Sequence, residues 1–120
     1  MLVVDDHVSF RSMAIRLLTG SGFSVIGETG SGAGAVRATE ELRPDLVLLD
    51  IQLPDIDGFV VAEALAGLQV RPDVVLMSSR SSTDYGSKVS DAPVAGFIPK
   101  ADLSGGAVRR LLSGPVSPPA

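Results

Sequence analysis

The 120-residue sequence predicts a single α/β domain in which helices cover both faces of a parallel sheet. Short, nearly continuous runs of Val, Leu and Ile recur along the chain, as expected for strands that are buried on both faces. Segments with apolar residues at helical spacing lie between these runs. The composition is 45% hydrophobic but only 4% aromatic, so the core of this domain must be built from aliphatic side chains.

Five strands are expected, and four of them end beside a polar residue. These four runs are Leu2–Val4 before Asp5, Leu46–Leu49 before Asp50, Val74–Met77 before Ser78, and Val94–Ile98 just before Lys100. A weaker fifth strand is expected at Phe23–Ile26.

Helical segments follow each strand, which gives the order (βα)₅ and right-handed crossovers. The expected helices are Phe10–Leu18, Ala35–Leu42, Phe59–Leu68, Ser82–Ser90 and Asp102–Leu112, the last with Asp102 as its N-cap. Ser82–Ser90 is a poor helix, because it holds Gly86 and few apolar residues. Residues 1–112 are therefore expected to form the domain, and residues 113–120 have the Pro/Ser-rich composition of a tail or the start of a linker.

Composition excludes several classes of function. Acidic residues outnumber basic ones by 14 to 10, a balance that argues against non-specific nucleic-acid binding. The sequence has no cysteine and one histidine, so thiol chemistry and a structural zinc site are excluded. No apolar run approaches the ~20 residues of a membrane span, and the N-terminus lacks a signal-peptide pattern, so we expect a cytoplasmic protein.

The polar residues at the strand ends form the candidate site. In an open doubly wound sheet, ligands bind beyond the carboxyl ends of the strands, where the strand order reverses. If the order is 2-1-3-4-5, the side chains of Asp5, Asp6, Asp50, Ser78 and Lys100 converge there. Clustered carboxylates favour a hard cation such as Mg²⁺ or Mn²⁺, while a lysine and a hydroxyl can stabilise a transferring phosphoryl group.

Four sequence motifs resemble the landmarks of response-regulator receiver domains, which have a flavodoxin-like fold. They occur in the family's order and span residues 2–112. They are Val3–His7, Leu46–Pro54 with Asp57 and Gly58, Leu76–Ser79, and Gly96–Lys100. Any one of them is weak, but together on a (βα)₅ pattern they are specific.

The resemblance implies roles for individual residues. Asp50 resembles the phosphoacceptor, Asp6 the direct Mg²⁺ ligand, and Asp5 a ligand that acts largely through water. The backbone carbonyl of Gln52 resembles the remaining protein ligand, beside Asp50 itself. Lys100 resembles the lysine that contacts the phosphoryl group.

Further roles concern switching. Ser78 resembles the switch serine or threonine, although the adjacent Ser79 is an alternative, and Phe97 resembles the aromatic switch residue. Gln52 and Arg80 resemble residues at positions that commonly tune the lifetime of the phosphate in this family. The resemblance also implies a cis peptide at Pro99.

The opening Asp5-Asp6-His7 is similar to the subfamily whose receivers precede a helix-turn-helix DNA-binding domain. The implied partners are a sensor histidine kinase or phosphotransfer protein, with DNA reached only through an output domain and homodimerisation as a further outcome. Such a domain phosphorylates and dephosphorylates itself but is not a turnover enzyme on other substrates. His7 is interpreted as a loop residue without a direct role.

Three other functions are consistent with parts of the sequence. Gly30–Ala35 fits a G-x-G-x-x-A dinucleotide motif, with Asp50 ~20 residues further on, but this alternative leaves Asp5, Ser78 and Lys100 unused. A haloacid-dehalogenase-like phosphatase would need an acid at Gln52. The remaining alternative is a receiver-like domain that signals without phosphorylation, which the intact acids disfavour.

Overall fold

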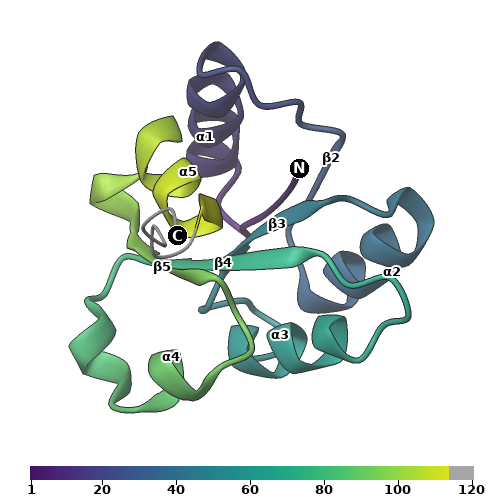
Figure 1. Ribbon diagram of the computed structural model, residues 1–120, viewed down its shortest axis with the longest axis vertical. Coiled ribbons are helices and arrows are strands. Elements are labelled where there is room, and N and C mark those ends of the chain that lie inside the picture. Colours follow the sequence, from purple (N-terminus) through teal and green to yellow (C-terminus); the bar gives the residue numbers. More distant parts are fainter. Residues whose placement is uncertain (114–120) are drawn as a thin grey trace, which may run out of the picture.

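A computed structural model describes residues 1–113 and shows one sheet with helices on both faces (Figure 1). The five strands are parallel and in the order β2-β1-β3-β4-β5, as predicted. The strands are β1 (Leu2–Val4), β2 (Gly27–Thr29), β3 (Leu46–Asp50), β4 (Asp73–Ser78) and β5 (Gly96–Pro99). The helices are α1 (Val8–Gly20), α2 (Gly32–Leu42), α3 (Gly58–Ala66), α4 (Lys88–Asp91) and α5 (Gly105–Ser113), with short 3₁₀ turns η1 (Ser82–Tyr85) and η2 (Lys100–Asp102). The predicted tail at 113–120 lies, after Ser113, outside the described residues.

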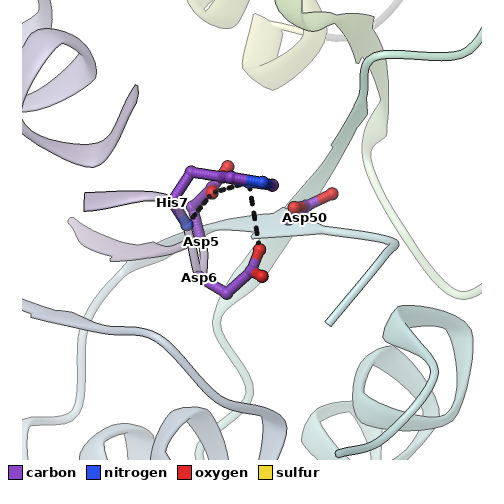
Figure 2. Close-up of side chains that lie close together, drawn as sticks. All are labelled: Asp5, Asp6, His7 and Asp50. Atoms are coloured by element: carbon purple, nitrogen blue, oxygen red, sulfur yellow. Dashed lines mark hydrogen bonds and ion pairs between the residues drawn. The ribbon is translucent and has the colours of Figure 1, made fainter. Parts of the chain in front are cut away.

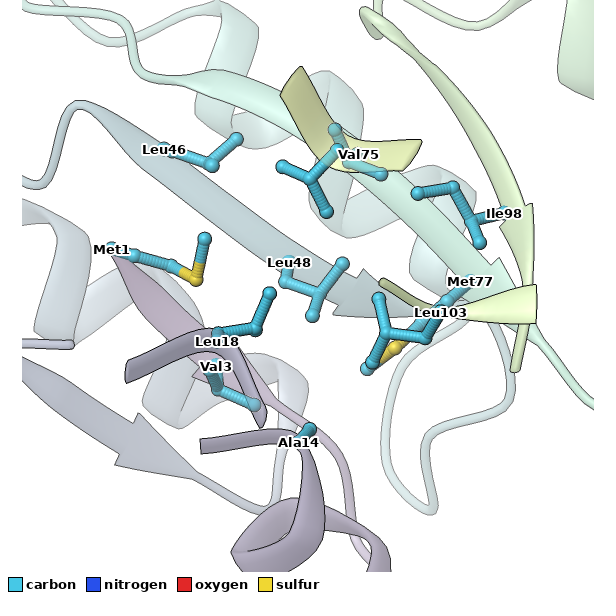
Figure 3. Packing of buried hydrophobic residues seen from close by; sticks show 11 residues of the cluster. Met1, Val3, Ala14, Leu18, Leu46, Leu48, Val75, Met77, Ile98 and Leu103 are labelled. Carbon is cyan, nitrogen blue, oxygen red and sulfur yellow. The ribbon is translucent and has the colours of Figure 1, made fainter. Parts of the chain in front are cut away.

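Two aliphatic clusters sandwich the sheet, and successive strand residues enter them alternately. Val3, Leu48, Val75 and Met77 face α1 and α5, where they pack with Leu18 of α1 (Figure 3). Their neighbours along the strands face α2 and α3; the strand members of this second cluster are Leu2, Val4, Val47, Leu49, Val74 and Leu76. The continuous aliphatic runs are explained by this burial on both faces. No helix within residues 1–113 is both long and apolar enough to cross a membrane.

The expected strand at Phe23–Ile26 is wrong, because β2 begins at Gly27. Gly27 pairs with Leu2 of β1, and the β2 sequence is Gly-Glu-Thr, without a large apolar residue. Phe23 and Val25 instead pack against the cluster beneath α1 and α5. β2 lies at the edge of the sheet, so it needs fewer apolar side chains than the central strands on which the prediction was based.

The connection between β4 and β5 is less helical than predicted. The segment Ser82–Ser90 contains the 3₁₀ turn η1 and the start of the single-turn helix α4, separated by Gly86. Gly86 has a φ of 60° and a ψ of −133°, a combination that interrupts a helix. No residue from 79 to 97 is buried, so packing does not compensate for the weak helical propensity.

Two further expectations near β5 are corrected. Asp102 is not the N-cap of the last helix, because it lies in η2, and the Ser104 hydroxyl instead accepts a hydrogen bond from the Ala107 N–H at 3.0 Å. The peptide before Pro99 is trans, since residues 1–113 hold no cis peptide bond.

Candidate functional site

The strand register brings the polar strand ends to one edge of the sheet. Val4 pairs with Leu49, which places Asp5 level with Asp50 at the end of β3. Asp50 pairs with Met77, so Ser78 lies one residue beyond it on β4. Lys100 follows Pro99, the partner of Ser78 on β5. The predicted convergence of these residues therefore follows from the parallel register.

The turn after β1 fixes Asp5 and exposes Asp6 (Figure 2). Asp5 is fully buried, and its Oδ1 accepts the backbone N–H of His7 at 2.8 Å. Its backbone carbonyl accepts a 2.6 Å hydrogen bond from Arg11, which also pairs with Glu28 of β2 at 2.7 Å. The side chain of Asp6 is 32% exposed, so one carboxylate of the pair is held inside and the other reaches solvent.

Lys100 bridges the two buried carboxylates. Its ammonium nitrogen lies 2.6 Å from Asp5 Oδ2 and 3.2 Å from Asp50 Oδ2. The same nitrogen lies 4.5 Å from the centroid of the Phe10 ring, which favours a cation over its face. Burial opposes the charge of Lys100, but the two carboxylates outweigh it and raise the pKa of Lys100.

Asp50 is 1% exposed, so its environment controls whether it carries charge. Burial raises the pKa of Asp50, and the backbone N–H of Gln52 and the Lys100 ammonium offset this only in part. The Gln52 N–H donates to Asp50 Oδ1 at 3.1 Å, while Oδ2 faces Lys100. Gln52 itself is exposed, in the turn after β3. Asp50 is therefore a buried carboxylate whose two oxygens are both oriented.

The donor atoms fit a divalent cation. One ligand atom each from Asp5, Asp6, His7 and Asp50 lies within 4.8 Å of the others. Carboxylate oxygens are the ligands that Mg²⁺ and Mn²⁺ prefer, and a single lysine does not neutralise three carboxylates. The Asp5, Asp6 and Asp50 side chains thus form a site that a cation would stabilise.

Ser78 and not Ser79 points into the fold. Ser78 is fully buried at the end of β4, whereas Ser79 is exposed. The Ser78 hydroxyl oxygen accepts a hydrogen bond from the backbone N–H of Arg80 at 3.0 Å and lies 2.5 Å from the hydroxyl of Tyr85. The Arg80 side chain is exposed. Phe97 on β5 is partly buried, with its ring centroid 6.4 Å from that of Tyr85.

The structure disfavours the dinucleotide alternative at Gly30–Ala35. The first N–H groups of α2 would have to bind a phosphate in that alternative. They instead donate to the carboxylate of Asp55, from Gly32 at 2.8 Å and from Ala33 at 3.0 Å. These hydrogen bonds lower the pKa of Asp55. A carboxylate from the loop after β3 therefore occupies the position that a phosphate would need.

Three residues near the site were not predicted from the sequence. The imidazole of His7 lies 3.4 Å from Asp5 and 3.2 Å from Asp6, although it was interpreted as a plain loop residue. Phe10 was assigned only to a helix face, yet it lies under Lys100. Tyr85 was not singled out at all; the only signal was a lone tyrosine in a serine-rich segment.

Comparisons with known proteins agree with this arrangement. Residues 1–104 match the family model described as the response regulator receiver domain. The DNA-binding transcriptional activator EvgA of Escherichia coli is 29% identical over 99 residues, which cover 82% of this chain and 48% of EvgA. A protein-glutamate methylesterase/protein-glutamine glutaminase of Alkalilimnicola ehrlichii is 38% identical over 110 residues, which cover 87% of this chain and 28% of that protein.

Among solved structures, the signal receiver domain of NarL from Mycobacterium tuberculosis superposes with a TM-score of 0.81 at 33% identity. The match covers 90% of each chain. By contrast, this chain spans less than half the length of the two curated relatives named above, with 48% of EvgA and 28% of the methylesterase covered.

Proposed function

The chain belongs to the receiver-domain family of two-component response regulators, and from that premise we propose that it is a switch activated by phosphorylation of Asp50. The observation that carries the proposal is the bridge from Lys100 to Asp5 and Asp50 at 2.6 and 3.2 Å. It places a cation beside a buried carboxylate in a cluster of acids. That combination suits the transfer of an anionic group onto Asp50 better than a structural role.

The proposed reaction is a phosphoryl transfer from a phosphohistidine. An oxygen of the Asp50 carboxylate attacks phosphorus, a P–O bond forms, and the P–N bond to the donor imidazole breaks with its electron pair returning to nitrogen. Lys100 stays protonated because its pKa is raised, so it can pair with a phosphoryl oxygen. The product is an acyl phosphate, and its hydrolysis by water restores the carboxylate.

A Mg²⁺ or Mn²⁺ ion would be held by the carboxylates of Asp5, Asp6 and Asp50 together with the backbone carbonyl of Gln52. Such an ion neutralises negative charge on the transferring group. Asp6, which is the most exposed of the three acids, is the proposed direct ligand, and the buried Asp5 is proposed to act largely through water. Asp5 also orients Lys100 at 2.6 Å.

The output of the switch is proposed to run through Ser78 and Phe97. The Ser78 hydroxyl would hydrogen-bond a phosphoryl oxygen on Asp50, and Phe97 would repack in response. Gln52 and Arg80 are proposed to tune the phosphate lifetime, and both have exposed side chains beside the site. No further chemistry on other substrates is proposed for this chain.

The proposed partner is a sensor histidine kinase or phosphotransfer protein in the cytoplasm. The relative EvgA is named as a DNA-binding activator, so an output domain that binds DNA is the proposed target of the switch. The charge of −4 on this chain agrees with DNA contact through such a domain and not through the receiver. Phosphorylation is also proposed to favour a homodimer.

The test is to incubate the protein with Mg²⁺ and a small acyl-phosphate donor and to map the modified residue by mass spectrometry. Asp50 should gain an acid-labile phosphoryl group, and Asp50→Asn should lose it completely while staying folded. Asp45→Asn is the matched control, because Asp45 is an exposed acid just before the opposite end of the same strand. Undiminished labelling of Asp50→Asn would falsify the proposal, and saturable NAD binding would instead favour the dinucleotide alternative.

A further inference from the structure

The Ser78 hydroxyl, which the proposed switch needs, already has a side-chain partner in this structure. Its oxygen lies 2.5 Å from the hydroxyl of Tyr85, seven residues further along the chain. The backbone N–H of Arg80 donates to the same oxygen at 3.0 Å. Ser78 is completely buried and Tyr85 is half-buried, so the serine side of this hydroxyl pair is shielded from competing water.

Tyr85 is anchored on its other side by aromatic rings. Its ring packs edge-on against Phe59 of α3, with a centroid separation of 5.6 Å, and against Phe97 of β5 at 6.4 Å. The interplanar angles are 69° and 61°, the edge-to-face geometry that aromatic pairs favour. Tyr85 is thus the one residue of η1 that reaches both Ser78 and the proposed aromatic switch residue.

We infer that Tyr85 is a positioning residue that holds Ser78 in the unphosphorylated state and is released when Ser78 turns to the phosphoryl group. This inference rests on the proposed phosphorylation of Asp50. Before that event the Tyr85 hydroxyl holds the serine, and the Tyr85 ring lies beside Phe97. After it, the serine hydroxyl donates to a phosphoryl oxygen and Tyr85 loses its partner.

The competition follows from the hydrogen-bonding capacity of a serine hydroxyl. A hydroxyl has one proton to donate, and a phosphoryl oxygen can only accept. If Ser78 donates to Tyr85, that proton must be redirected to the phosphoryl oxygen and the contact is lost. If Tyr85 donates, the inference requires the serine oxygen to move towards Asp50 and away from Tyr85. In either case the contact, which activation breaks, opposes activation.

Releasing Tyr85 also links the site to the β4–β5 connection. Tyr85 contacts Ser78 through its hydroxyl and Phe97 through its ring, so a change at Ser78 reaches Phe97 through Tyr85. Tyr85 is the last residue of η1, which has no buried residue, so its departure meets little resistance from packing. The displaced tyrosine then alters the exposed surface formed by residues 79–95.

The decisive variant is Tyr85→Phe, which keeps the ring packing and removes only the hydroxyl. The affinity for beryllofluoride, a mimic of the phosphoryl group, is measured by titration calorimetry with saturating Mg²⁺. Tyr85→Phe should bind about two- to tenfold more tightly than wild type, the range expected for one net hydrogen bond lost from the unliganded state alone. Ser79→Ala, at the exposed neighbouring serine, should leave the affinity unchanged.

A double-mutant comparison isolates the hydroxyl pair. In a Ser78→Ala background Tyr85→Phe should have no effect on the affinity, because the partner of the tyrosine is already gone. Tyr85 is the single tyrosine and the chain has no tryptophan, so tyrosine fluorescence reports on this site alone. Beryllofluoride should change that fluorescence in wild type and change it much less in Ser78→Ala.

The outcomes separate the inference from the function on which it rests. Wild type that fails to bind beryllofluoride would overturn the proposed phosphorylation and the role of Tyr85 with it. Wild type that binds, with Tyr85→Phe equal or weaker, would overturn the role of Tyr85 alone. If the role of Tyr85 were purely structural, Tyr85→Phe would lower the free energy of unfolding without raising the affinity for beryllofluoride. That result is again the second outcome.

Discussion

Two regions of this receiver meet at Ser78 and differ in how they are built. The acidic edge comprises Asp5, Asp6, Asp50 and Lys100, and the strands leading to it are buried: every residue of β1 and β3 is inaccessible or nearly so. The β4–β5 connection, residues 79–95, has no buried residue and only one short 3₁₀ turn and one turn of helix. The proposed chemistry lies at the buried edge, and the loosely packed elements lie in the β4–β5 connection.

The difference explains how one charge on Asp50 could alter a distant surface. A buried edge holds reacting groups in fixed geometry, which phosphoryl transfer requires. A segment with few packing contacts opens at small free-energy cost, and switching elements come from such segments. The Ser78–Tyr85 contact at 2.5 Å is the link between the two regions.

The largest expected effect comes from removing the lysine of the acidic edge. Lys100→Met should lower the free energy of unfolding by about 3 kcal/mol in the absence of divalent cations, because it leaves the fully buried Asp5 and the buried Asp50 without their cation. Lys88→Met should change it by about 0.5 kcal/mol or less, since Lys88 is exposed and lies 6.0 Å from the Phe59 ring. Urea unfolding with EDTA measures both values.

Mg²⁺ should restore part of the stability of Lys100→Met, because a bound cation replaces the missing positive charge. The same addition should not affect the difference between Lys88→Met and wild type. Equal destabilisation by the two substitutions would contradict the contrast between the regions.

Two glycines sharpen the contrast at an intermediate magnitude. A Cβ on Gly58 would lie 2.5 Å from the Ile51 Cα and 2.6 Å from the Asp50 carbonyl oxygen. Gly58→Ala must therefore displace the backbone at Asp50, the proposed phosphoacceptor, and we expect the free energy of unfolding to fall by about 1–3 kcal/mol. Gly86 has open space around it but a φ of 60°, so a side chain there strains only the backbone.

For Gly86→Ala the backbone strain can be relieved by local opening of the β4–β5 connection, so its free-energy cost is limited. The global free energy of unfolding should fall by less than about 1 kcal/mol, while amide hydrogen exchange should speed up within residues 79–95. Exchange that speeds up across the whole sheet would show that the connection is not an independent region.

The central strands and the acidic edge were predictable for the same reason. The aliphatic runs that end at Asp5, Asp50 and Ser78 predict which strands are buried. They also predict that the polar residues lie together, since parallel strands align their carboxyl ends. The edge strand β2 was missed because Gly27–Thr29 has no apolar signature. Its position depends on pairing with β1, which is a tertiary contact.

The side-chain contacts that cross between elements could not be predicted. The approach of Lys100 to Phe10, and of Tyr85 to Ser78, depends on rotamers and on how a short turn folds back over the sheet. Asp55 is a similar case, because nothing local indicates that it caps α2, 23 residues away from Gly32. The ends of the helices were easier to predict than these contacts, although the N-cap of α5 is Ser104 and not the expected Asp102.

The smallest expected effect is a pair of stability changes of opposite sign, at the carboxyl groups of Asp50 and Asp55, measured in metal-free protein. The buried Asp50 has a raised pKa, so the folded state holds its proton more tightly than the unfolded state does. Between the usual value of 3.8 and the folded pKa of Asp50, the free energy of unfolding therefore falls as pH rises, and the full loss is present above the folded pKa. Asp50→Asn removes this loss. The variant should be more stable than wild type at pH 7, and its advantage should shrink as pH falls through the folded pKa of Asp50.

Asp55 should behave in the opposite way, which makes Asp55→Asn the matched control. The N–H groups of Ala33 and Gly32 lower the pKa of Asp55, so its ionised form stabilises the fold above pH 3.8, and this contribution is lost as pH falls through its folded pKa. Asp55→Asn should thus be less stable than wild type at pH 7, and the difference should vanish in acid. Urea unfolding of the three proteins between pH 3 and 7, with EDTA present, measures both differences. If Asp50→Asn also loses stability at pH 7, burial does not control the charge of Asp50, and the acidic edge is stabilised by its charges and not strained by them.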